Sequence, residues 1–199
     1  MRTVTVTGHG TAKVVPDSAV LRVSAVHRAA SLAEALAGAT SAGAVVTAVA
    51  RAHVDAARVA SRELSVWPAH DHEGRQSGFE ARHAYTVGCA DLDVAGALVT
   101  ELAAQVGDRL QVERVSLEVS DTSAAVAAAR EAAYADARAR AEHLAGLAGV
   151  SLGDVQTVVE GGSTAPMARG FEAMAKADVV LEPGEGELGW SLTVTWAIA

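Results

Sequence analysis

The chain begins and ends with segments in which apolar and polar residues alternate. In residues 3–7 two valines alternate with three threonines, and in residues 188–198 every second position is Leu, Trp, Val or Ile. A period of two places one set of side chains on a single face of a β-strand. We therefore predict a half-buried strand near each end of the chain.

Five further segments carry strand patterns, over residues 19–28, 62–71, 79–90, 110–120 and 155–160. A polar stretch with two glycines, residues 73–78, separates two of them and predicts a hairpin. Gly8-His9-Gly10 interrupts the first strand, and because glycine adopts backbone angles that other residues avoid, we expect a β-bulge there. A phosphate-binding loop is the alternative for this Gly-x-Gly, but no helix follows it.

Three segments predict helices. Ser31 and Glu34 have capping-box spacing, and an alanine-rich helix follows to about His53. Asp91 is a candidate cap for a short helix over residues 94–106. The longest helix runs from about residue 123 to 148, and its inner face is almost entirely alanine, which lets it lie close to a sheet.

The resulting order is β-β-α-β-β-α-β-α-β-β, which predicts the α+β class. We expect a mostly antiparallel sheet, with two long helices and one short helix packed on one face, built from two strand–helix–strand halves. No change in composition marks a linker, so one domain over residues 1–199 is predicted. Residues 161–186 form a long excursion of about 26 residues, more than a plain connection needs.

Charge and composition exclude some partners. The formal net charge of −8, without a basic cluster, argues against nucleic acid or an anionic membrane surface. We expect no membrane span and see no pattern of an export signal, which favours a cytoplasmic location unless such a signal has been removed. Cys89 is the only cysteine, excludes an internal disulfide, and is interpreted as a buried apolar residue.

Three histidines are the candidates for a metal site. His70 and His72 point to the same face of a strand, a spacing that two metal-binding imidazoles can use, and His83 lies across the hairpin. The alternative is a solvated hairpin tip, with His83 packed on the face of Phe79 and Tyr85. The metal hypothesis is the weaker one because no second histidine cluster accompanies it.

We identify no catalytic residues and no cofactor site in the sequence. A nucleophile elbow and a serine–histidine–acid pattern are both absent from it. Met167, Phe171 and Met174 lie at four- and three-residue spacing within the excursion, which fits a short amphipathic helix. They either contact another subunit or fold back over the sheet, and they are the main candidates for an oligomer contact.

Several ordered motifs resemble the SIMPL-domain family. They are Val4 to Gly10, Val15-Pro16-Asp17, Gly78 to Ala81 with Tyr85-Thr86-Val87, Ala129 to Glu142 with Ala148 to Gly153, and Glu182 to Glu185 before the last strand. Together they span nearly the whole chain. The resemblance implies an α+β bacterial protein that forms ring-like or channel-like homo-oligomers. Many members of that family are exported to the cell envelope and are linked to oxidative stress, and none supplies a catalytic residue to carry over.

Three functional hypotheses follow. The leading one is a protein without enzymatic activity that assembles with itself through sheet edges and the excursion. The second is a metal-dependent enzyme or metal-binding protein that uses His70, His72 and His83. The third is a module that binds a small ligand between the helices and the sheet.

Overall fold

The computed structural model describes residues 2–162 and 180–199, and it confirms the α+β class and the predicted order of helices and strands. Its contacts divide the chain into two compact units. Unit 1 contains described residues 2–16, 121–162 and 184–199, and unit 2 contains residues 17–120 and 180–183. Each unit has its own antiparallel sheet and its own core.

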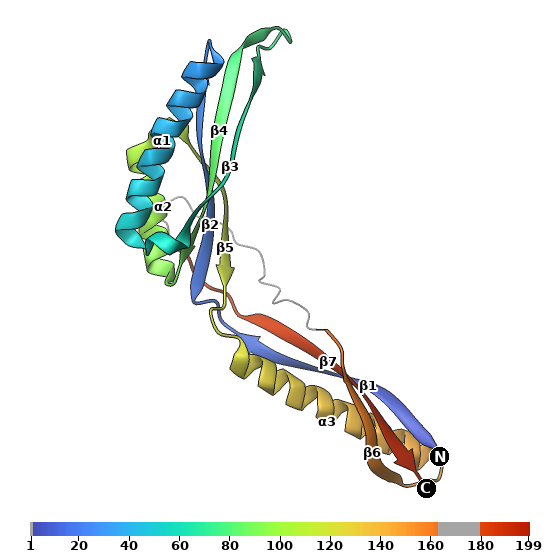
Figure 1. The fold of residues 1–199 in the computed structure, drawn as a ribbon. Coiled ribbons are helices and arrows are strands. Elements are labelled where there is room, and N and C mark those ends of the chain that lie inside the picture. The colour runs from blue at the N-terminus through green and yellow to red at the C-terminus, as the bar shows by residue number, and fades with distance from the viewer. Residues whose placement is uncertain (1, 163–179) are drawn as a thin grey trace. The chain divides into compact units, whose positions relative to one another are not determined.

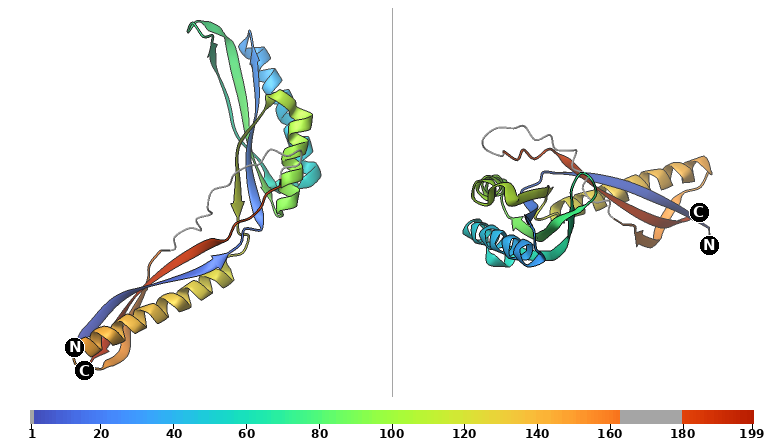
Figure 2. Two further views of the ribbon diagram at one scale, coloured as in Figure 1. Left: turned by 180° about the vertical axis from the view of Figure 1, so that it is seen from behind. Right: turned by 90° about the horizontal axis from the view of Figure 1, so that it is seen from above.

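Unit 1 is a three-stranded sheet with one helix on it. The strands are β1 (Thr3–Val14), β6 (Leu152–Glu160) and β7 (Gly186–Ile198), in the order β1-β7-β6. Helix α3 (Ser123–Leu147) lies along β1 and β7, as Figures 1 and 2 show. The first and last strands of the chain are therefore partners, with Thr3 opposite Ala197.

Gly8 and Gly10 form no bulge, so that prediction is wrong. β1 pairs with β7 in one unbroken register from Thr3 to Val14. A Cβ at Gly8 would lie 2.2 Å from the carbonyl oxygen of Ala133, and one at Gly10 equally close to that of Ala129. The glycines are there because the backbone of α3 comes too close to β1 for any side chain.

The helix side of this contact is a stripe of alanines, as the sequence predicts. The five residues Ala129, Ala133, Ala137, Ala141 and Ala145 recur at four-residue spacing and are all buried. Ala133, Ala137 and Ala141 pack with Leu192, Val194 and Trp196 of β7, which belong to the apolar face predicted for the last strand. The alanines of α3 and the glycines of β1 thus let the helix lie close to the sheet.

Unit 2 is a four-stranded antiparallel sheet covered on one face by two helices. The strands are β2 (Ser18–Ala29), β3 (Val59–His70), β4 (Gln76–Cys89) and β5 (Leu110–Glu118), in the order β3-β4-β2-β5. The helices are α1 (Leu32–His53) and α2 (Leu92–Val106), which lie side by side in Figure 2. Two single-turn helices, η1 (Ala56–Arg58) and η2 (Gly107–Arg109), lead into β3 and β5.

The predicted caps of these helices are confirmed. The Ser31 hydroxyl accepts from the Glu34 amide, and Asp91 accepts from the amides of Asp93 and Val94, so α2 begins at Leu92. Two glycines inside α1 also have a packing reason: a Cβ at Gly38 would meet the His27 ring, and one at Gly43 would meet the hydroxyl of Tyr85.

α1 corrects the expectation that no segment is long and apolar enough for a membrane span. This helix of 22 residues passes that test by length and composition, with a mean hydropathy of 1.5 over a window of 18 residues. Core helices of globular domains pass the same test. α1 packs against β2 and β4, and its residues Ala35, Ala39 and Val46 are completely buried there.

The strands form two sheets, not the one shared sheet predicted, because β1 leaves the following strands and pairs with β7. One domain over residues 1–199 stays a prediction. Of the predicted excursion, residues 161–162 and 180–185 are described, and Leu181 packs in the core of unit 2.

Candidate functional site

His70, His72 and His83 do not come together in the structure. His83 of β4 lies opposite Leu64 of β3, and six residues of strand separate Leu64 from His70, which amounts to roughly 20 Å. Among residues 2–162 and 180–199, no group of three or more His, Cys, Asp or Glu side chains is placed to hold a metal ion. The three histidines are therefore not placed to bind one metal ion together, as the sequence hypothesis requires.

His70 and His72 belong to the hairpin tip between β3 and β4. The side chain of His72 is 91% exposed, and its nearest charged neighbour is Glu73 at 4.0 Å. The carboxylate of Asp71 accepts from the amides of Glu73 and Arg75, both at 2.9 Å, and so shapes the turn. This is the solvated tip that the sequence offered as the alternative to metal binding.

His83 instead takes part in a chain of side-chain hydrogen bonds on the helix-covered face of the unit 2 sheet. Its Nε2 lies 2.6 Å from the Ser61 hydroxyl, and its Nδ1 lies 2.8 Å from the Tyr85 hydroxyl. The Tyr85 hydroxyl lies against α1, where a Cβ added at Gly43 would be 2.2 Å from it. Burial lowers the pKa of His83 and raises that of Tyr85, so both are neutral near pH 7.

The tautomer of His83 decides what this chain can do. With its hydrogen on Nδ1, His83 donates to the Tyr85 oxygen, and Nε2 then carries a lone pair. That lone pair faces the hydroxyl of Ser61, an exposed residue on β3.

The arrangement of Ser61 and His83 is that of a nucleophile beside a general base. Its third member is the neutral phenol of Tyr85, whereas a serine hydrolase places a carboxylate there to stabilise the imidazolium. His83 can thus take the proton of Ser61, but the Tyr85 phenol stabilises the resulting imidazolium only weakly.

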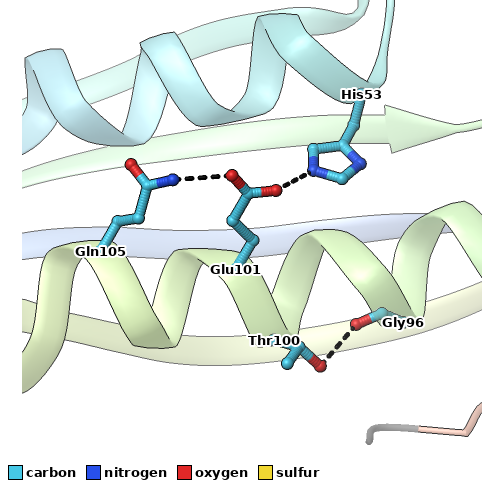
Figure 3. A network of polar contacts seen from close by, with 5 residues as sticks. All are labelled: His53, Gly96, Thr100, Glu101 and Gln105. Atoms are coloured by element: carbon cyan, nitrogen blue, oxygen red, sulfur yellow. Dashed lines mark hydrogen bonds and ion pairs between the residues drawn. The ribbon is translucent and has the colours of Figure 1, made fainter.

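A second polar network joins the two helices of unit 2. Nε2 of His53, in the last turn of α1, lies 2.5 Å from Oε2 of Glu101 on α2, and Gln105 donates to the other carboxylate oxygen at 2.6 Å (Figure 3). Thr100, one residue before Glu101, bonds back to the carbonyl of Gly96 within α2. Both oxygens of Glu101 are engaged, so this network ties α1 to α2.

The third network lies on the sheet face of unit 2 that the helices leave open. Ser24 is completely buried, donates to Glu113 and accepts from Nε of Arg82 at 2.9 Å, and Arg82 also pairs with Glu113. The hydrogen bond from Ser24 is the main reason that the pKa of Glu113 is lowered, ahead of the contribution of Arg82. Each group already has its partner, which favours a structural role.

Unit 2 also has an open cavity of about 510 Å³, of the size that small ligands occupy. Its charged lining residues are Arg28 and Glu80, which pair with each other, and Asp108 and Arg109 of η2. The charges balance and the lining is mostly polar, whereas ligand pockets are mostly apolar. Its lining residues belong to β2, β4, η2 and β5 and none to α1 or α2, so the cavity differs from the helix–sheet pocket of the third hypothesis.

The sheet edges of unit 1 differ from each other. On β6, every residue except Leu152 is exposed, including Val155, Val158 and Val159 at 41%, 52% and 59%. The other edge strand, β1, receives side chains of α3 along its free side: Asp136 accepts from the His9 amide at 2.8 Å. Edge strands with free backbone groups and apolar side chains are templates for another strand.

The oligomer-contact candidates Met167, Phe171 and Met174 lie outside the described residues. What the sequence analysis missed is the chain from Ser61 through His83 to Tyr85. Its only sequence signal was the spacing of His83 and Tyr85, which places both on one strand face. Ser61 comes from β3, and its approach to His83 depends on the register of β3 against β4.

Comparison with protein families matches residues 4–196 to SIMPL, described as a protein of unknown function (DUF541). A comparison with curated proteins finds no match. The family match covers almost the whole chain, including all strands that form the two sheets. The chain therefore belongs to the SIMPL family.

Proposed function

We propose that this protein acts by assembling with copies of itself, through β6 of unit 1, and that its role is binding rather than catalysis. The observation that carries the proposal is the exposure of β6, an edge strand with Val155, Val158 and Val159 uncovered. Burying apolar side chains stabilises an interface by about 25 cal/mol per Å². A second strand added to β6 would also pair its free backbone groups.

The other free edges are less suited to pairing. β3 contains Pro68 and two register shifts, and β5 has a register shift beside Glu113. Proline, charges and bulges are the means by which proteins block an edge. β6 has register shifts only before Thr157, and from there to Glu160 it pairs regularly with β7 and contains no proline or basic residue.

Sedimentation velocity over a range of protein concentrations tests this proposal. We expect a discrete species larger than the monomer, and Val159→Lys should shift it to monomer because a lysine replaces an apolar side chain of the interface and blocks an edge strand. Val15→Lys is the control, since Val15 is similarly exposed, at 53%, but lies outside the strands. A wild-type protein that stays monomeric throughout, or a control that dissociates equally, would refute the proposal.

The resemblance to exported, stress-linked relatives extends the proposal to an envelope location and a role in oxidative stress. Both extensions stay predictions. They are tested by fractionating cells that express the full-length gene and by measuring peroxide survival after its deletion. A cytoplasmic protein whose loss leaves survival unchanged would remove both.

One observation favours a second candidate function, acyl transfer at Ser61. In such a step Oγ of Ser61 attacks an ester carbonyl, its proton passes to Nε2 of His83, and the alcohol leaves with that proton. A fluorophosphonate probe should then label the wild type but not Ser61→Ala, with reduced labelling of His83→Gln. Equal labelling of wild type and Ser61→Ala would eliminate this candidate.

A further inference from the structure

The free edge of β1 is occupied near its middle by two side chains of α3. The amide of His9 donates to Oδ2 of Asp136 at 2.8 Å, and Nη1 of Arg140 donates to the carbonyl oxygen of Thr7 at 3.2 Å. Asp136 and Arg140 also bond each other, at 3.1 Å between Nε and Oδ1. In an antiparallel strand, residues two apart turn their backbone groups to the same side, so Thr7 and His9 share the edge that faces away from β7.

This arrangement is more than a surface ion pair. An exposed i,i+4 pair contributes only about 0.3–0.5 kcal/mol and needs no strand beside it. Here each partner also bonds a backbone atom of β1 that an incoming strand would use. The hydrogen bond from the His9 amide holds the carboxylate at the strand, and it is the largest cause of the lowered pKa of Asp136, ahead of Arg140.

The close approach of α3 brings these side chains within reach. Gly8 and Gly10 let the helix backbone lie against β1, and Asp136 immediately precedes Ala137, whose amide nitrogen a Cβ at Gly8 would meet at 2.4 Å. A neighbouring pair provides the contrast. Arg138 and Glu142 have the same spacing and a bond of 2.9 Å, but lie about 200° around the helix from Asp136 and Arg140.

We infer that Asp136 and Arg140 close the middle of the β1 edge of unit 1, at Thr7 and His9, and thereby limit self-assembly to pairing at β6. This inference rests on the proposed function. If both edges were open, β6 of one copy would pair with β1 of the next, and such head-to-tail contacts add copies without end unless the rotation closes a ring. With β1 closed, the β6 strands of two copies pair with each other about a two-fold axis, and assembly through this contact stops at two copies.

The test compares two double variants by sedimentation velocity. Asp136→Ala with Arg140→Ala opens the edge, and Arg138→Ala with Glu142→Ala removes an ion pair of the same kind from the same helix. We expect the control to keep the size distribution of the wild type, and the edge-opened variant to form larger particles that grow with concentration. Adding His9→Pro to the edge-opened variant should restore the wild-type distribution, because proline has no amide hydrogen for a new strand.

The outcomes separate this inference from the proposed function. If the wild type is monomeric and the edge-opened variant polymerises, the proposed assembly of the wild type through β6 is refuted, whereas the closure of the β1 edge by Asp136 and Arg140 is supported. An assembling wild type whose two double variants behave alike would overturn the closed edge and leave the proposed function standing.

Amide hydrogen exchange covers the case in which the edge-opened variant does not fold. In the wild type the amide of His9 should exchange at least several-fold more slowly than that of Thr5, which lies on the same edge of β1. Equal exchange of these two amides would overturn the inference without any variant.

Discussion

Replacing Gly8 by alanine tests how closely α3 and β1 pack. The added Cβ would lie 2.2 Å from the carbonyl oxygen of Ala133 and 2.4 Å from the amide nitrogen of Ala137. An ordinary carbon–oxygen contact is about 3.3–3.6 Å, so α3 would have to withdraw by roughly 1 Å. Both atoms belong to a helix backbone, which cannot rotate aside as a side chain can.

The expected cost follows from that withdrawal. A gap of about 1 Å forfeits up to roughly half of each dispersion contact, and overpacking by one methyl group costs typically about 1–3 kcal/mol. Alanine restricts the unfolded chain and returns about 0.4–1 kcal/mol only where its native geometry is unstrained. We therefore expect Gly8→Ala to lower the free energy of unfolding by about 2 kcal/mol or more.

Urea unfolding followed by tryptophan fluorescence measures this change. Trp190 and Trp196 lie in unit 1, so a Trp67→Phe background removes the signal from unit 2. Gly146→Ala on the same helix is the control, since nothing lies within 4 Å of its added Cβ, and helix propensity predicts a gain of up to about 1 kcal/mol. An unfolding midpoint of Gly8→Ala at or above that of the wild type would refute the packing argument.

Three further predictions concern unit 2. Hydrogen bonds from Ser120 lower the pKa of Asp17 in the folded protein. The stability that the Asp17 carboxylate contributes is therefore present above about pH 4 and is lost as the pH falls through the lowered pKa. Asp17→Asn should flatten the acid side of the stability–pH curve, and an unchanged slope would contradict this. Cys89 is 1% exposed and burial raises the pKa of its thiol, so a thiol reagent should modify it far more slowly in the native protein than in denaturant; equal rates would refute its burial. Gly43→Ala should destabilise the protein despite better helix propensity, because the new Cβ would lie 2.2 Å from the Tyr85 hydroxyl. In a double-mutant cycle, Tyr85→Phe should recover part of the lost stability. Fully additive effects of the two substitutions would argue against the clash.

Local patterns predicted most individual elements. The alternation in residues 188–198 identified the buried face of β7, and the alanines of α3 identified the surface that meets the sheet. The caps at Ser31 and Asp91 were predictable because a cap depends on residues only a few positions apart. Family membership followed from the order of such motifs along the chain.

The candidate sites were less predictable, because proximity between strands depends on register. The hairpin predicted from the sequence suggested that His70 and His83 lie near each other across the two strands, yet Leu64 is the residue opposite His83. Conversely, no local pattern relates Ser61 to His83, since one lies on β3 and the other on β4. The network of Ser24, Arg82 and Glu113 likewise draws on three different strands.

Gly8 and Asp136 illustrate what the sequence determines and what the tertiary structure determines. The sequence by itself determined that residues 3–7 can form a strand, that residues 123 to about 148 form a helix with an alanine face, and that Asp136 and Arg140 can pair along it. Only the tertiary structure decided that this helix lies on β1, that glycine is required beneath it, and that the ion pair bonds the strand edge. The reason is physical: helix and strand patterns arise from neighbours in the chain, whereas the pairing of β1 with β7 joins residues almost the full chain length apart and depends on which surfaces bury each other best.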